Sequence, residues 1–359
     1  MTVCSRRNSM IWSLLVCGLL GSQAQGAADT TKAQGAADSM PVVSISSSPA
    51  FVLLGVTPSS IAQPGNIRDY KLDFATQSAF KTPDVSLELK PLWLTWLGHD
   101  RGFTHWPWYK RVLSSFGLAA GMVNQTGDTT ATALAVKMNL YRAADPLCDP
   151  AYETSVRRHP TVPDSIIVKL WILRDFLKDS TKASDSTRLT WQHKYDSIEA
   201  LEQPYLSAET HRIDSIKKDY ETKNWNSAQI EVGGGVRSNV EWLTDNELQF
   251  DSTGGAAWIT ACTGIGTSVL VSGMYRLTIN PGRLDNTVGF NARWGGPKSG
   301  LFAEVLIDIK GNKGHLSYGG GGEYSISRNV QIQYGIKTAQ DGAVGLTPSL
   351  GLSLMPSKS

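Results

Sequence analysis

LSYGGGGEYSISRNVQIQYGIKT, residues 316–338, contains two runs of alternating apolar and polar residues on either side of a short polar break, 327–329. Alternation with a period of two places one kind of side chain on each face of a β-strand. The two runs therefore predict a β-hairpin. The predicted apolar face consists of Leu316, Tyr318, Tyr324, Ile326, Val330, Ile332, Tyr334 and Ile336.

Four consecutive glycines, 319–322, lie inside the first of these runs without interrupting its alternation. Glycine weakens a strand, so its presence usually marks a sharp bend or a close approach of other groups. We interpret the four glycines as the place where a closed sheet coils strongly. They would also leave interior space for long side chains from neighbouring strands.

The same period recurs along most of the chain after residue 85. We count about 11 strands of roughly 9 to 14 residues, longer than the 5 or 6 residues that are common in globular proteins. Short turn-like sequences such as NPGRLDN, GGPKSG and GNKG separate them. This order predicts an up-and-down meander of antiparallel strands. An even count is usual, so one strand is missing, and we expect it in 241–253 rather than near 70–76.

A meander of many long strands removes its exposed edges only by closing into a barrel. Strand length, an export signal and aromatic residues near strand ends favour a membrane barrel over a soluble one. The fold class predicted is all-β, an antiparallel up-and-down transmembrane β-barrel of about 12 strands with a helical insertion. The aromatic residues assigned to the membrane interface are Trp93, Trp258, Tyr275, Trp294 and Tyr334.

The stretches SPAFVLLGVTPSSIAQPGNIRDY, residues 48–70, and VSLELKPLWL, residues 85–94, carry a family resemblance. The chain resembles bacterial outer-membrane β-barrel proteins, and in particular a group with an SPAFxLLG-like N-terminal stretch. The resemblance extends from about residue 48 to the end and implies location in the cell outer membrane. Many such barrels end on an aromatic residue, whereas this chain ends LSLMPSKS.

The N-terminal part divides into three predicted segments. Residues 1–24 form a signal peptide, because two arginines precede the apolar run 10–21 and small residues follow it. A lipoprotein signal at Cys17 is the alternative. Residues 25–47 repeat QGAAD and predict a disordered spacer. We expect residues 48–82 to form an irregular plug or periplasmic arm. Residues 83–355 are expected to form the barrel.

Residues 144–224 interrupt the strand pattern with apolar residues at helical spacing. They predict two or three amphipathic helices inserted between strands. If the N-terminal segment is periplasmic and Val85 starts the first strand, this insertion emerges at the cell surface. Outer-membrane barrels place their long loops there.

The sequence indicates neither catalysis nor a cofactor. His99, Asp100 and His105 lie in one connection, which we interpret as a membrane-interface loop, without a nucleophile motif or an HExxH pair. We therefore expect no enzyme activity, no catalytic or cofactor-binding residues and no metal site. A formal net charge of +2, with scattered basic residues, argues against nucleic acid. The cysteines outside the signal, Cys148 and Cys262, are expected to be unpaired thiols.

On the polar phase of the strands, charged residues of both signs predict ion pairs across a narrow lumen. We expect the protein to contact membrane lipid and to be a structural or assembly component that docks an envelope protein through 144–224. The alternative is a narrow channel or transporter for small solutes. The lumen-facing polar residues predicted are Glu88, Lys90, Lys137, Glu231, Arg237, Arg276, Arg293, Glu304, Asp308, Lys310, Glu323 and Lys337.

Overall fold

The structure, a computed structural model, describes residues 48–354 with gaps at 57–58, 60, 62–69, 77–83, 96, 98–105, 125–128, 147, 158–165, 167, 170–171, 174–184, 243–247, 312, 328–329 and 339–345. The predicted signal peptide and spacer, residues 1–47, lie outside the described residues. All described residues belong to one compact unit, Ser39–Ser359.

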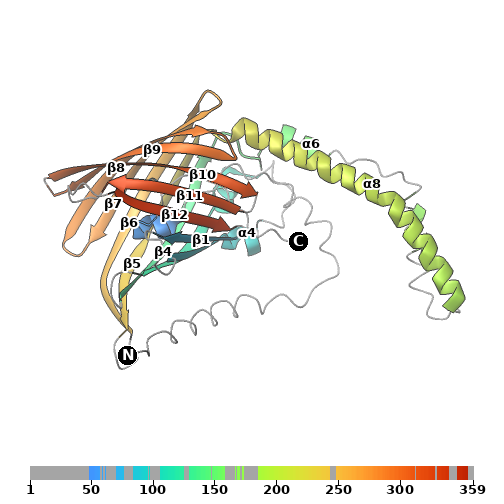
Figure 1. Ribbon diagram of the computed structural model, residues 1–359, viewed down its shortest axis with the longest axis horizontal. Coiled ribbons are helices and arrows are strands. Elements are labelled where there is room, and N and C mark those ends of the chain that lie inside the picture. Colours follow the sequence, from blue (N-terminus) through green and yellow to red (C-terminus); the bar gives the residue numbers. More distant parts are fainter. Residues whose placement is uncertain are drawn as a thin grey trace. The chain divides into compact units, whose positions relative to one another are not determined.

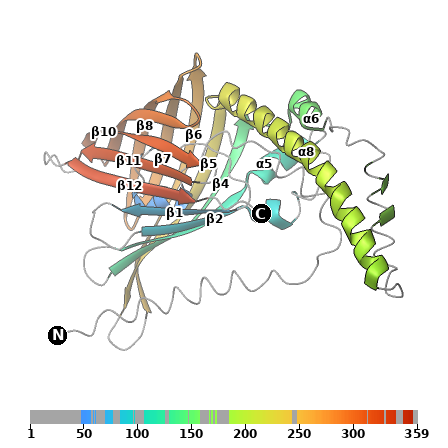
Figure 2. The same cartoon turned by 45° about the vertical axis from the view of Figure 1, so that its right-hand side comes forward.

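Twelve strands in the described part of the chain form a closed antiparallel barrel (Figure 1). Each strand pairs with its neighbour in sequence, and β1 pairs with β12 to close the ring (Figure 2). The predicted fold class is confirmed. The strands are β1 Tyr70–Thr76, β2 Asp84–Leu89, β3 Gly117–Asn124, β4 Thr129–Arg142, β5 Gln229–Trp242, β6 Leu248–Ile265, β7 Val269–Asn280, β8 Arg283–Gly295, β9 Ser299–Lys310, β10 Lys313–Ser327, β11 Val330–Thr338 and β12 Leu346–Leu354.

The barrel has its apolar face outside and its polar face inside. Along β9, Leu301 is 60% exposed and Val305 43%, whereas Glu304 is 2% and Asp308 4% exposed. A water-soluble barrel would show the opposite arrangement, since burial of an apolar side chain is favourable and burial of a charge is costly. The outer face is therefore suited to lipid, and the closed sheet leaves no strand edge unpaired.

The hairpin of β10 and β11 shows why four glycines occur together. A Cβ added at Gly321 would lie 2.8 Å from the Phe302 ring, which packs over this position inside the barrel. A Cβ added at Gly322 would lie 2.6 Å from Cζ of Tyr334. Aromatic rings thus cover both faces of the glycine run, an arrangement known to support glycines in curved sheets.

The missing strand lies upstream of residue 85, so its predicted position in 241–253 is wrong. Tyr70–Thr76 forms β1, which pairs with both β2 and β12. Within 241–253, Trp242 ends β5 and Leu248 begins β6, so this stretch extends two known strands. The barrel consequently begins at Tyr70, before the predicted boundary at residue 83.

This extra strand changes the side of the membrane on which the insertion is expected. Strand β4 ends at Arg142 and β5 begins at Gln229, so the insertion lies at the barrel end where β1 begins and β12 ends. The prediction that the insertion lies at the cell surface assumes that Val85 starts the first strand. One additional strand before Val85 reverses the direction of every later strand, so a periplasmic N-terminal segment now predicts the insertion at the periplasmic end.

Five helices are described in the connections and the N-terminal segment. The long helix α8 contains Pro204, and two residues after its end anchor it to the β6–β7 turn. Trp225 Nε1 donates to the Thr267 carbonyl at 3.0 Å, and Asn226 Nδ2 to that of Gly266 at 2.9 Å. The helices are α3 Pro49–Leu54, α4 Pro91–Thr95, α5 Trp108–Ser114, α6 Pro150–Arg157 and α8 Asp185–Asn224.

Helix α6 packs on the C-terminal part of α8. The rings of Tyr152 and Tyr220 lie 4.7 Å apart, and Arg212 donates to the carbonyl of Ser155 at 2.6 Å. Among the described helices, none is long and apolar enough to cross a membrane.

Two of the aromatic residues assigned to the membrane interface are buried. Trp93 is 5% exposed in α4, and Trp258 is 4% exposed on the inward face of β6. Inward positions on β6 alternate with outward ones such as Ile259, and the ring of Trp258 covers Gly233 on β5. Tyr275, Trp294 and Tyr334 are each about half exposed on outward positions.

Candidate functional site: the occupied barrel lumen

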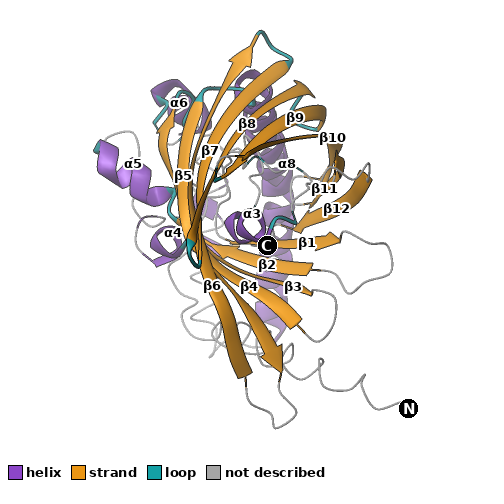
Figure 3. Ribbon diagram, turned by 90° about the vertical axis from the view of Figure 1, so that its left-hand side faces the viewer, coloured by secondary structure: helices purple, strands orange, loops and turns teal. Residues whose placement is uncertain are grey.

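Helix α3 lies inside the ring of strands (Figure 3). Ser48 has an extended backbone, Pro49 opens the helix, and Gly55 ends it in the left-handed conformation with φ 74°. Proline is favoured at the first helical position and glycine just after the last. Residues Pro49–Leu53 are all buried, as expected for a helix surrounded by protein.

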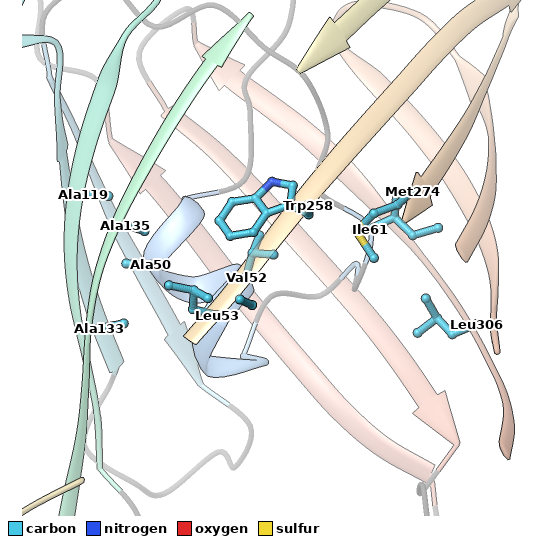
Figure 4. Close-up of a cluster of buried hydrophobic side chains, with 11 residues drawn as sticks. Ala50, Val52, Leu53, Ile61, Ala119, Ala133, Ala135, Trp258, Met274 and Leu306 are labelled. Carbon is cyan, nitrogen blue, oxygen red and sulfur yellow. The ribbon is translucent and has the colours of Figure 1, made fainter. Parts of the chain in front are cut away.

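One wall of the barrel, β3 to β5, has small inward residues that fit against α3 (Figure 4). A Cβ added at Gly121 would lie 2.9 Å from Cβ of Ala50, and one added at Gly235 would lie 2.6 Å from Cδ1 of Leu53. Larger side chains at these positions would displace the helix. We call this surface the α3 seat; its inward residues are Ala119, Gly121, Ala133, Ala135 and Gly235.

The segment following α3 crosses the lumen and contacts the opposite wall. The Ser59 hydroxyl donates to Glu304 Oε2 at 2.8 Å. Ile61 is 0% exposed and packs in one apolar cluster with Trp258, Met274 and Leu306 (Figure 4). We call the described residues of 48–61 the plug, because they extend from the wall at β3–β5 to the wall at β6–β9.

Ile61 occupies a small apolar depression in an otherwise polar part of the wall. A Cβ added at Gly289 would lie 3.0 Å from Cγ1 of Ile61 and 2.8 Å from Cδ2 of Leu306. Glycine at this position thus leaves the room that the isoleucine side chain fills. We call the depression formed by Trp258, Met274, Gly289 and Leu306 the Ile61 socket.

At the insertion end of the lumen, a buried carboxylate collects several donors. Glu323 forms an ion pair with Arg293 and accepts hydrogen bonds from Gln331 at 3.1 Å and Gln333 at 3.4 Å. The Arg293 guanidinium also lies 5.0 Å from the centre of the Trp225 ring, which follows α8. This cluster ties β8, β10 and β11 to the end of the insertion.

Two further ion pairs are buried on the first strands. Lys137 Nζ lies 2.9 Å from Glu88 Oε1, and Lys71 Nζ lies 2.8 Å from Asp73 Oδ2. All four side chains are at least nine-tenths buried. Breaking such a pair by removing one partner leaves an uncompensated buried charge. The Lys137–Glu88 pair therefore links β4 to β2 inside the barrel, whereas the Lys71–Asp73 pair lies within β1.

The twelve predicted lumen residues lie on or beside inward positions of their strands, but to different depths. The partly buried ones include Arg237, whose Nη2 donates to Asn280 Oδ1 at 2.9 Å, and Arg276. Lys90 follows the end of β2. The buried residues are Glu88, Lys90, Lys137, Glu231, Arg293, Glu304, Asp308 and Glu323; the partly buried ones are Arg237, Arg276, Lys310 and Lys337.

Sequence reasoning missed the residues that receive the plug. Ser59 and Ile61 lie in a segment without periodicity, and Trp258 was placed on the wrong face. A signal was nevertheless present in β3 and β4. Most of their polar-phase positions before Lys137 carry alanine or glycine instead of polar residues, which indicates that something apolar fills the lumen beside them.

Other candidate groups do not form a site. His99, Asp100 and His105 lie outside the described residues, and within the described part of the chain no three His, Cys, Asp or Glu side chains gather for a metal ion. The predicted free thiols Cys148 and Cys262 are unpaired. Cys148 Sγ lies 3.6 Å from Asp145 Oδ2, and burial together with this carboxylate raises the pKa of Cys148 to about 12.

Burial, together with the charge of Asp149, raises the pKa of the Tyr220 phenol in α8.

Comparison with known proteins finds similarity in structure only. No family model and no curated protein sequence matches the chain. Among solved structures, a KdgM porin has 8% identity and a TM-score of 0.39, covering 80% of this chain and 99% of that one. The β domain of the Bordetella autotransporter BrkA has 8% identity, a TM-score of 0.30 and coverage of 79% and 97%. The CymD monoaromatic hydrocarbon channel has 10% identity, a TM-score of 0.28 and coverage of 80% and 88%.

The closed sheet, the apolar exterior and the charged interior define the class. The chain is an outer-membrane β-barrel, with 12 strands in its described residues, and its apolar outer surface is suited to contact with lipid. Its lumen is crossed by a segment of its own N-terminal region.

Proposed function

We propose that the protein is a narrow outer-membrane channel for small solutes, closed in this structure by the plug. The occupied lumen carries the proposal. Barrels of about eight strands fill their interior with side chains, whereas larger ones enclose space. Here a separate segment, packed on small residues, occupies part of that space.

The two walls of the lumen differ in a way that fits a removable plug. Alanine and glycine face α3 on β3 to β5, while the wall at β7 to β11 carries Arg276, Asn291, Glu304 and Glu323. Withdrawal of the plug would leave a pathway lined by small residues at the α3 seat, by Lys137 and Glu231 beyond the seat on the same wall, and by charged residues on the opposite wall. A barrel with a purely structural role does not require small inward residues that fit a helix of the plug, nor a polar lining on the opposite wall.

Deletion of 48–61 tests the proposal by ion conductance in planar bilayers. Wild-type barrels should remain closed with rare openings, and barrels without the plug should conduct continuously. Heat-modifiable migration on gels should show first that the shortened barrel folds. A folded barrel that conducts no better than wild type after the deletion would contradict the proposal.

A second candidate function is docking of an envelope protein through the insertion. Leu189 and Leu201 of α8 are 61% and 59% exposed. Val168 and Ile172, which precede α8 in the insertion, are 53% and 49% exposed. Exposed apolar residues in such number are typical of contact surfaces. A protein that copurifies with the intact chain and is lost when 144–224 is deleted would support this function; its retention would exclude the insertion as the docking element.

A further inference from the structure

We infer that the Ile61 socket is a solute-binding site, which the plug occupies by placing a side chain of its own where part of a solute would bind. This inference rests on the proposed channel function and adds the class of solute. The ligand class is a small neutral molecule with a branched aliphatic group and hydrogen-bond acceptor oxygens.

The apolar part of the ligand follows from the shape of the socket. Ile61 is completely buried among Trp258, Met274 and Leu306, and Gly289 leaves the space under its side chain. Strand pairing aligns Met274 with Gly289 and Gly289 with Leu306, so these three residues form one row across β7, β8 and β9. The space along this row, which the Ile61 side chain fills, matches one branched aliphatic group.

The polar part follows from buried groups that have no hydrogen-bond partner among the described residues. Those next to the row of Met274, Gly289 and Leu306 are Thr260 Oγ1 and Asn291 Nδ2. Thr260 is paired with Met274 in register, and Asn291 follows Gly289 by two positions on the same face of β8. A buried polar group without a partner is costly, so a site that places two of them beside an apolar socket is suited to a ligand that supplies their partners.

The type of these groups identifies the complementary atoms. The Asn291 amide nitrogen is a donor only, and the Thr260 hydroxyl can donate. A ligand would therefore present carbonyl or hydroxyl oxygens to them. Glu304, which is paired in register with Asn291, already accepts a hydrogen bond from the Ser59 hydroxyl of the plug, so a hydroxyl or amide donor on the ligand can take the place of Ser59.

The charges around the socket favour a neutral ligand. Glu304 lies one row toward the insertion end, and Arg276 lies one row toward the other end. An anion would approach the Glu304 carboxylate, and a cation the Arg276 guanidinium. Each row also carries the opposite charge, Lys337 in the row of Glu304 and Asp308 in the row of Arg276, so an ion of either sign gains little net attraction to offset the cost of its burial.

N-acetyl-L-isoleucinamide is a suitable probe, because it carries an isoleucine side chain, two carbonyl oxygens and no net charge. Its binding can be measured by calorimetry on the detergent-solubilised full chain with Ser59→Gly and Ile61→Gly, which vacates the socket while α3 is unchanged. We expect saturable binding at one site, and binding at least tenfold weaker to the wild-type chain, whose own Ile61 competes.

Two controls decide the outcome. Adding Gly289→Val to the vacated variant fills the socket and should weaken binding at least tenfold, with heat-modifiable migration showing that the barrel still folds. N-acetylglycinamide, which has no aliphatic side chain, should not bind. Absence of binding to the vacated variant, equal binding after Gly289→Val, or equal binding of the glycine compound would overturn the inference.

Conductance of the barrel lacking 48–61, recorded without any probe, separates this inference from the proposed function. A conducting barrel whose vacated socket binds no probe means that the inference is wrong and the channel function stands. A vacated socket that binds the probe in a barrel that never conducts supports the site and contradicts the channel.

Discussion

Neighbouring residues of β9 face opposite surroundings, and their chemistry follows from this. Ile307 is 40% exposed toward lipid, whereas Asp308 accepts a hydrogen bond from Thr287 inside the lumen at 2.5 Å. Because the side-chain period of a strand is two, a change of one position transfers a residue from lipid to the interior. The effect of an introduced charge on stability therefore depends on whether its position faces the lipid or the lumen.

Ile307→Arg should destabilise the barrel by about 2–4 kcal/mol, because it places a guanidinium in the hydrocarbon. Unfolding by guanidinium chloride in lipid vesicles measures this change. Gln333→Arg is the matched control, since Gln333 is partly buried in the lumen beside the Glu323 carboxylate, and it should cost much less. Equal costs at the two positions would show that the two faces are assigned wrongly.

The Cys148 thiol should react slowly with iodoacetamide at pH 8, because the thiolate is the reactive form and burial with Asp145 raises the pKa of Cys148 to about 12. In a Cys262→Ala background, the rate should go on rising with pH beyond 9. Asp145→Asn removes the carboxylate, lowers this pKa and should accelerate the reaction at pH 8. A rate that does not change with this substitution would exclude the carboxylate as a cause.

At the scale of elements, alternation was sufficient to predict most of the barrel wall. The long strands β8 to β11 carry uninterrupted two-residue periods, because each has one face in lipid and one in a polar lumen. Strand β1 was missed because YKLDFAT has only seven residues and Pro83 follows soon after it. Pro83 lies beyond the end of β1 at Thr76, so it does not interrupt the strand.

The plug could not be predicted in the same way. Helix α3 has six residues, too few for a periodic signal, and a helix this short is not stable without its surroundings. Its partners, such as Ala133 and Gly235, are far away in sequence and come together only when the barrel closes. Small residues on the polar phase indicate that the lumen is filled, but not which segment fills it.

The fit between α3 and its seat can be tested at Gly121. Gly121→Val should displace α3, because an added Cβ would lie 2.9 Å from Cβ of Ala50. Overpacking of this kind costs about 1–3 kcal/mol, which corresponds to roughly a fivefold to hundredfold shift toward the open barrel. Single-channel open probability measures this shift.

Gly273→Val is the control for Gly121→Val, because the nearest atom to a Cβ added at Gly273 is 3.8 Å away, on the ring of the outward residue Phe290. It should leave the open probability unchanged. An equal increase for both variants, or none for Gly121→Val, would contradict a role of the seat in closure.

At the scale of the whole molecule, strand count determines the side of the insertion. With 12 strands, the insertion lies at the barrel end that also holds the start of β1 and the end of β12. An epitope placed at Lys182 should therefore bind antibody only after the outer membrane is permeabilised. Binding on intact cells would place the insertion at the surface and reverse the orientation of every strand.

A reversible covalent lock can test whether the plug controls passage through the lumen. The hydroxyl oxygens of Ser48 on the plug and Ser86 on β2 lie 2.5 Å apart, so cysteines at both positions are close enough to form a disulfide. Ile61→Asp in the same chain should free the other end of the plug, since a buried unpaired charge is unfavourable. Cys148→Ser and Cys262→Ala remove the native thiols.

The deciding measurement is the single-channel conductance of this locked chain before and after addition of a reductant. We expect closed channels while the disulfide holds the plug, and steady conductance once the disulfide is reduced. The same chain with Ser86 retained should conduct regardless of reductant. Conductance that is equal before and after reduction, in barrels shown to contain the disulfide, would contradict the claim that the plug closes this channel.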